Sequence, residues 1–220
     1  MPRFDTLTSI HKAIRAMVYE KGGALQTTDF ADRQEAARAA ADLETVLFLL
    51  HDHHTTEEKF VFPKLRPFEE QLVDAMLAQH QEVVRLLDIT EEARMLVTAV
   101  DAEDRVAAGA DLNRRFNELI AFYFDHLARE EVEVLPATWR HFDDGELMAI
   151  QGAIVGEAEP GVAFQWLAWM FKGLSRPELV GLLSGAKMAM PPEALEAVRG
   201  LGAASLEPAA WKAVREQSGL

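Results

Sequence analysis

Cysteine is absent from all 220 residues of the chain. Its absence excludes disulfide bonds, thiolate metal ligands, iron–sulfur clusters and a cysteine nucleophile. A chain without disulfides suits a reducing compartment, and we expect a cytoplasmic protein. The opening residues also lack the apolar stretch of a secretory signal, so no export is expected.

Long hydrophobic runs are missing as well. The longest apolar run lies near residues 162–171 and is interrupted by Gln165. A membrane-spanning helix needs roughly 20 apolar residues. We therefore expect no membrane partner.

Basic residues are scarce relative to acidic ones. The 22 Lys and Arg residues face 36 Asp and Glu residues, for a net charge of −14. Binding to nucleic acid requires a basic face, so no nucleic-acid partner is expected. Hydrophobic residues make up 49% of the chain, which is typical of a globular protein.

Four long segments carry the apolar periodicity of helices, and no segment alternates like a strand. The predicted helices cover about residues 5–22, 32–62, 68–100 and 104–134. Gly22-Gly23 is expected to end the first helix, Pro63 the second and Pro136 the fourth. Long helices joined by short loops pack as antiparallel neighbours. The prediction is an all-α, up-and-down four-helix bundle.

Beyond Trp139 the chain becomes richer in Gly, Pro and Trp. Shorter helices are predicted over about residues 144–154, 161–172, 177–186, 191–199 and 207–217. Their apolar side is expected to include Trp166, Trp169, Met170 and Phe171. We predict a bundle domain over residues 1–140 and a helical extension over 141–220 that packs on it. A protein partner or a second copy of the chain could bind through this extension.

An internal repeat carries the chemistry. In two segments a histidine is followed by glutamate at +4 and +5 and by proline at +10. The segments hold His53, Glu57, Glu58 and Pro63, and His126, Glu130, Glu131 and Pro136. A spacing of four places histidine and glutamate one turn apart on one helix face. The repeat on the second and fourth helices predicts a pseudo-two-fold site inside the bundle.

Each predicted bundle helix puts one histidine on an apolar stripe. The stripes are Leu7, Ile14 and Val18 around His11; Val46, Leu49, Leu50 and Phe60 around His53; Val73, Met76, Leu77, Val84 and Leu87 around His80; and Leu119, Phe122 and Tyr123 around His126. A single histidine on such a stripe is more often a core residue than a ligand. The repeat, together with one histidine on each remaining helix, favours a metal site.

Charge supports the same interpretation. Glu57 and Glu130 would be buried, and no Lys or Arg shares these stripes. Buried carboxylates need a partner or a bound cation. Nitrogen and oxygen ligands without sulfur suit iron or manganese, and zinc is possible. The predicted ligands are His11, His53, Glu57, His80, His126 and Glu130.

This ordered set of ligands resembles the hemerythrin-like (HHE cation-binding) family over about residues 5–136. The resemblance implies a non-haem centre of two iron ions. Glu57 and Glu130 would bridge the ions, an oxo or hydroxo group would complete the bridge, and the four histidines would be terminal ligands. Such centres bind dioxygen or nitric oxide, or report redox state.

The chain departs from the oxygen-carrying hemerythrins on the third helix, where those proteins place two histidines one turn apart. Here Met76 and Val84 flank His80 at four residues. One terminal ligand would be missing, and water or His54 could fill the open position. His54 could instead contact a ligand or lie at the surface.

Five other residues complete the predicted surroundings. Glu58 and Glu131 could accept hydrogen bonds from ligating histidines and orient them. Tyr123 is expected to face inward, and His51 and His141 are expected at the surface.

Three functions remain open at this point. The first is a protein that binds or senses dioxygen, nitric oxide or iron and redox status. The second is a di-iron enzyme acting as a peroxidase, an oxidase or a nitric-oxide reductase, so that peroxide is a further small partner. The third is a metal-free structural module whose histidines fill the core.

Overall fold

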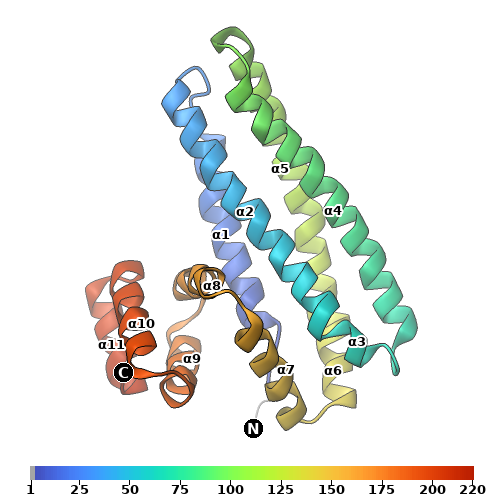
Figure 1. The fold of residues 1–220 in the computed structure, drawn as a ribbon, viewed down its shortest axis with the longest axis vertical. Coiled ribbons are helices and arrows are strands. Elements are labelled where there is room, and N and C mark those ends of the chain that lie inside the picture. The colour runs from blue at the N-terminus through green and yellow to red at the C-terminus, as the bar shows by residue number, and fades with distance from the viewer. Residues whose placement is uncertain (1–2) are drawn as a thin grey trace. The chain divides into compact units, whose positions relative to one another are not determined.

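The computed structural model describes residues 3–220, and every regular element within them is a helix. The helices are α1 (Thr8–Gln26), α2 (Arg33–Phe60), α3 (Phe62–Leu65), α4 (Glu70–Ala99), α5 (Ala102–Arg129), the π-helix η1 (Glu130–Val134), α6 (Leu135–His141), α7 (Asp144–Glu157), α8 (Pro160–Gly173), α9 (Arg176–Ala189), α10 (Pro192–Ser205) and α11 (Pro208–Ser218). Figure 1 shows long helices first and short ones after them. The predicted all-α class is confirmed.

The chain forms two compact units. The first holds the described residues up to Leu7 together with Val18–Glu157, and the second holds Thr8–Met17 and Ala158–Leu220. The division runs through α1, and α7 groups with the first unit. The domain boundary at residue 140 remains a prediction.

Within the first unit α4 packs along both α2 and α5, as Figure 1 shows. The C-terminal half of α1 joins them. The rings of Tyr19 and Phe124 meet edge to face at 5.6 Å between centroids. Lys21 lies 3.0 Å from the carboxylate of Asp42 on α2. These contacts make the four-helix bundle.

The start of α2 follows its sequence signal. The carboxylate of Asp32 accepts hydrogen bonds from the backbone N–H groups of Gln34 at 2.7 Å and Glu35 at 2.9 Å. These bonds satisfy donors that the first turn of a helix leaves unpaired. The predicted start near residue 32 is confirmed.

The predicted end of the first helix was wrong. Gly22 and Gly23 lie inside α1, which continues to Gln26. Glycine weakens a helix but can adopt its backbone. The helix also buries Leu25 beyond the pair, and a Cβ on Gly22 would lie only 3.1 Å from the ring of Phe116. Tertiary packing therefore outweighs the low helix propensity of glycine.

The two prolines behave differently from each other. Helix α2 ends at Phe60, just before Pro63, as predicted. The predicted end of the fourth helix at Pro136 was wrong, because α5 passes through η1 directly into α6. Pro63 lies in the first turn of α3, where a missing N–H costs little. Pro136 is the second residue of α6, which follows η1 without a break.

Each of the two units has an apolar cluster of buried residues as its core. One cluster closes an end of the first unit with residues from α3, α4, η1, α6 and α7. Its buried members include Phe62, Leu65, Met76, Val134, Leu147 and Ile150. The second unit has its own core around Phe171, Leu183 and Trp211.

No helix in the described chain is long and apolar enough to cross a bilayer.

Candidate metal centre

Three α-helices and the π-helix η1 carry the candidate ligands of the first unit. These are His53 and Glu57 on α2, His80 on α4, His126 on α5 and Glu130 at the start of η1. All five are buried, and Glu57 is only 3% exposed. Each histidine–glutamate pair shares a helix face because four residues make slightly more than one turn.

The π-helix η1 explains how the residues that follow α5 keep facing the core. Steps of four residues drift by about 40° around an α-helix, so Val134 would move away from the face of His126 and Glu130. A π-helix holds more residues per turn and reverses the drift. Val134 and Leu135 are buried as a result. No local pattern predicted this π-helix, which begins at the candidate ligand Glu130.

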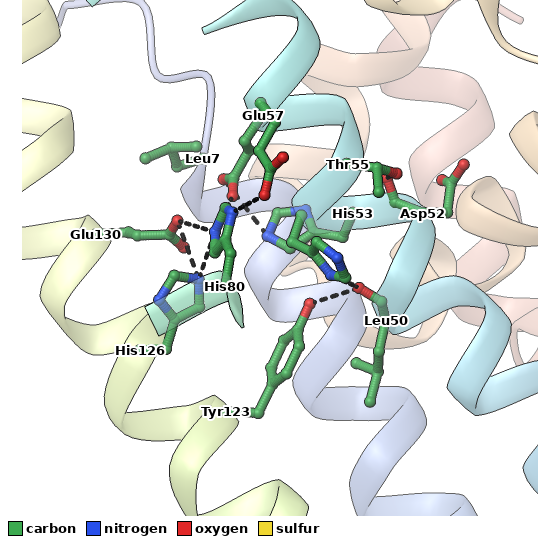
Figure 2. Close-up of polar contacts among 12 residues, drawn as sticks. Leu7, Leu50, Asp52, His53, Thr55, Glu57, His80, Tyr123, His126 and Glu130 are labelled. Atoms are coloured by element: carbon green, nitrogen blue, oxygen red, sulfur yellow. Dashed lines mark hydrogen bonds and ion pairs between the residues drawn. The ribbon is translucent and has the colours of Figure 1, made fainter. Parts of the chain in front are cut away.

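Figure 2 shows the side chains converging from their separate helices. His126 Nε2 lies 3.2 Å from Glu130 Oε1, and His53 Nε2 lies 3.5 Å from Glu57 Oε1. His80 Nε2 lies 3.6 Å from Glu57 Oε2 and 3.8 Å from Glu130 Oε1. Each carboxylate therefore lies within 3.8 Å of two imidazoles: Glu57 near His53 and His80, and Glu130 near His126 and His80.

The donor atoms form two overlapping groups. One donor atom each from Glu57, His80, His126 and Glu130 all lie within 4.8 Å of one another. The same limit holds among His53, Glu57 and Glu130. His11 is fully buried on α1, in the segment that belongs to the second unit. Its role as a ligand remains a prediction.

Hydrogen bonds fix the tautomers of two imidazoles. His80 Nδ1 lies 2.8 Å from Glu58 Oε1, and His126 Nδ1 lies 3.1 Å from Gln79 Oε1. Carboxylate and amide oxygens accept hydrogen bonds, so each Nδ1 donates its proton. Each Nε2 then presents a lone pair to the interior.

The resulting interior is rich in acceptors. The Nε2 atoms of His80 and His126 are 3.1 Å apart and face the carboxylates of Glu57 and Glu130. Lone pairs and carboxylates at this separation repel one another unless a proton or a metal ion lies between them. Imidazole nitrogen and carboxylate oxygen suit iron, manganese or zinc. The residues present fit a metal centre.

A comparison with protein families decides the family. The model of the hemerythrin HHE cation-binding domain matches residues 3–138, which is more than half of the chain. The chain belongs to the hemerythrin HHE cation-binding family. No curated protein and no solved structure matches it.

The cluster of His53, Glu57, His80, His126 and Glu130 is called the hemerythrin site below. When no cation is bound, its electrostatics favour the neutral form of its buried acidic groups. Burial, followed by the nearby charge of Glu130, raises the pKa of the Glu57 carboxyl well above its usual range. Burial likewise raises the pKa of Tyr123 well above its usual range, with Glu57 and Glu130 adding to the effect. A metal ion would reverse this preference at Glu57 by stabilising the carboxylate.

His54 is buried, so the alternative that it lies at the surface was wrong. It is 1% exposed, and its Nδ1 donates to the carbonyl oxygen of Leu50 at 3.1 Å. Burial, followed by the charge of His80, lowers its pKa to about 4. Its ring lies 5.2 Å from that of His80, but it is in neither donor group of the hemerythrin site.

Tyr123 faces the interior as predicted. It is fully buried, and its hydroxyl donates to the same Leu50 carbonyl at 2.9 Å. Its ring centroid lies 6.0 Å from that of His126 and 6.5 Å from that of His53. The phenol therefore borders the hemerythrin site while its proton points to the backbone.

The placement of Val84 on the inward stripe was wrong. Val84 is 36% exposed, whereas Val83 is fully buried. The inward direction from His80 continues at three residues toward the C-terminus and at four toward the N-terminus, where Met76 is buried. Val84 therefore does not mark an open ligand position.

Some of the remaining predicted neighbours lie where they were expected, and others do not. Glu58 bonds to His80 as expected. His51 is exposed as expected, but His141 is partly buried. Its ring stacks on Phe68, and its Nε2 lies 2.9 Å from Glu69 Oε1. Gln79 was missed, because no motif marks a lone glutamine beside a ligand.

Proposed function

We propose that this hemerythrin-like chain holds two iron ions and binds or senses dioxygen, nitric oxide or redox status. The observation that carries the proposal is the pair of buried carboxylates, Glu57 and Glu130, shared by two groups of imidazole and carboxylate donors. Two such groups around common carboxylates suit a pair of ions rather than one. Manganese and zinc are the competing metals.

In this proposal each side chain has a defined role. Glu57 and Glu130 would bridge the ions, and His80 and His126 would bind one of them. His53 would bind the other ion, with His11 as its predicted companion. The iron pair would supply reversible one-electron chemistry and a site for a small ligand.

The protein around the centre would keep water and larger reactants out. Met76 and Phe62 are buried, and the Phe62 ring stacks on His80 at 5.2 Å between centroids. An apolar enclosure favours small uncharged ligands over ions. Dioxygen and nitric oxide meet both conditions. Binding by a protein partner or a second copy through the C-terminal helices, and a cytoplasmic location, are further parts of the proposal.

The experiment uses protein loaded with iron and then reduced. The protein is kept under an inert gas, and dioxygen or nitric oxide is added separately and then removed. The visible spectrum is recorded at each step. A binder would give a distinct spectrum that returns when the gas is removed. A spectrum unchanged by either gas, over iron-loaded protein, would contradict the proposal.

A second candidate is a di-iron enzyme that reduces peroxide or nitric oxide or acts as an oxidase. Tyr123 favours it, since a buried phenol beside two candidate ligands could donate an electron and a proton. Sustained turnover of peroxide or nitric oxide with an added reductant would support this candidate. The variant Tyr123→Phe should then lower that turnover.

A further inference from the structure

We infer that Glu58 is a positioning residue that selectively secures one of the two metal ions by fixing the tautomer and orientation of His80. This inference rests on the proposed metal centre and adds a residue that does not itself touch the metal. The feature behind it is a contact between helices, from the carboxylate of Glu58 on α2 to His80 Nδ1 on α4 at 2.8 Å.

The bond joins a partly exposed carboxylate to a buried ring. The side chain of Glu58 keeps 41% of its surface exposed, while that of His80 keeps 1%. The Glu58 carboxylate therefore avoids the full cost of burying a polar group. Hydrogen bonds to an ionised acceptor are roughly twice as strong as neutral ones. Glu58 is well placed to hold a ring that is otherwise shielded from water.

The hydrogen bond to Glu58 decides which nitrogen of His80 presents a lone pair to the metal centre. An imidazole has only one proton to donate when neutral, so a proton held at Nδ1 leaves the lone pair at Nε2. His80 Nε2 is the atom that lies 3.6 Å from Glu57 Oε2. If the proton moved to Nε2, the ring would present a donor where a ligand is needed. Glu58 thus keeps His80 in the form that binds metal.

The neighbouring ligand is held more weakly. His126 Nδ1 meets Gln79 Oε1, a neutral amide, at 3.1 Å. His80 and His126 belong to the same donor group, whereas His53 belongs to the other. Loss of Glu58 should therefore affect one ion far more than its partner. Partners of this kind typically change metal affinity by about 10–100-fold.

The test titrates the metal-free full chain with cobalt(II) and records the visible absorption and the number of ions bound. For Glu58→Leu we expect one of two cobalt sites to weaken by about 10–100-fold, while the other is retained. Glu58→Gln keeps an acceptor oxygen and should recover part of the affinity. Glu82→Leu is the matched control, because Glu82 lies on α4 near His80 but pairs with Arg85.

A second measurement needs no metal. Nitrogen-15 NMR of the imidazoles in the metal-free chain reports which ring nitrogen carries the proton. His80 should hold its proton at Nδ1 in the unmodified protein and in Glu82→Leu, and should populate both tautomers in Glu58→Leu. An unchanged tautomer together with two unchanged cobalt sites in Glu58→Leu would overturn the inference. Failure of the unmodified chain to bind two ions would instead overturn the proposed centre.

Discussion

The hydroxyl of Tyr123 donates a 2.9 Å hydrogen bond to the carbonyl oxygen of Leu50, and so ties α5 to α2 beside the candidate metal centre. Both residues are fully buried. Since the bond uses a backbone acceptor, the phenol is held in place without any metal. This explains how an inward tyrosine can be structural and still border the site.

Replacing Tyr123 by Phe should lower the free energy of unfolding by about 1 kcal/mol, the usual net value of one hydrogen bond. The ring and its packing are retained, so metal content should not change. Chemical denaturation and metal analysis of the purified variant check both statements. A loss of metal would show that the hydroxyl does more than join two helices.

The double variant His53→Ala with Glu57→Ala should lose metal and the stability that metal supplies. At a free metal concentration 100 times the dissociation constant, each site adds about 2.7 kcal/mol. Thermal unfolding with and without a chelator measures this contribution. The control is His51→Ala, because His51 is exposed and lies one turn before His54. Equal chelator effects in the double variant and the control would contradict the metal assignment.

Sequence patterns predicted most of the inward-facing residues but few of the contacts between helices. The spacing of His53 and Glu57 identified a buried pair, because the period of a helix is fixed by its backbone. The contact of Gln79 with His126 crosses from α4 to α5, and no local pattern encodes it. The π-helix at Glu130 likewise depends on packing around it. Val84 was misplaced because a stripe of apolar residues does not show which edge of it faces the core.

Glu57→Gln should have opposite effects on the metal-free and metal-loaded proteins. Without metal, burial and Glu130 raise the pKa of Glu57 in the folded state. The unfolded state then loses its proton first, so stability falls as the pH rises above about 4.5 toward the raised value. Glutamine carries no charge and should remove that loss, which makes the metal-free variant more stable at neutral pH. The metal-loaded variant should bind metal more weakly.

Unfolding curves of both proteins between pH 5 and 8, with and without metal, provide the measurement for Glu57→Gln. The difference between the metal-free curves should grow with pH. A metal-free variant that is less stable than the unmodified chain across this range would show that the carboxylate is stabilised by something other than a metal ion.

His54 should make the metal-free protein sensitive to acid. Its pKa is about 4 in the folded state, because burial disfavours the charged ring. In the unfolded state the pKa returns to about 6.5, so unfolding takes up a proton between these values. Stability should therefore fall as the pH drops from about 6.5 to 4. The variant His54→Asn retains a donor for Leu50 but cannot titrate, and its stability should fall less over this range.

The most direct test of the account is the number of iron ions per chain. The protein is produced in iron-supplemented medium, purified without chelator, and analysed for metals alongside its visible spectrum. The account predicts two irons per chain and absorption bands of a ferric pair that disappear on reduction. Substoichiometric iron with a featureless spectrum would contradict the di-iron centre, and two ions of zinc or manganese in its place would retain the site but change its chemistry.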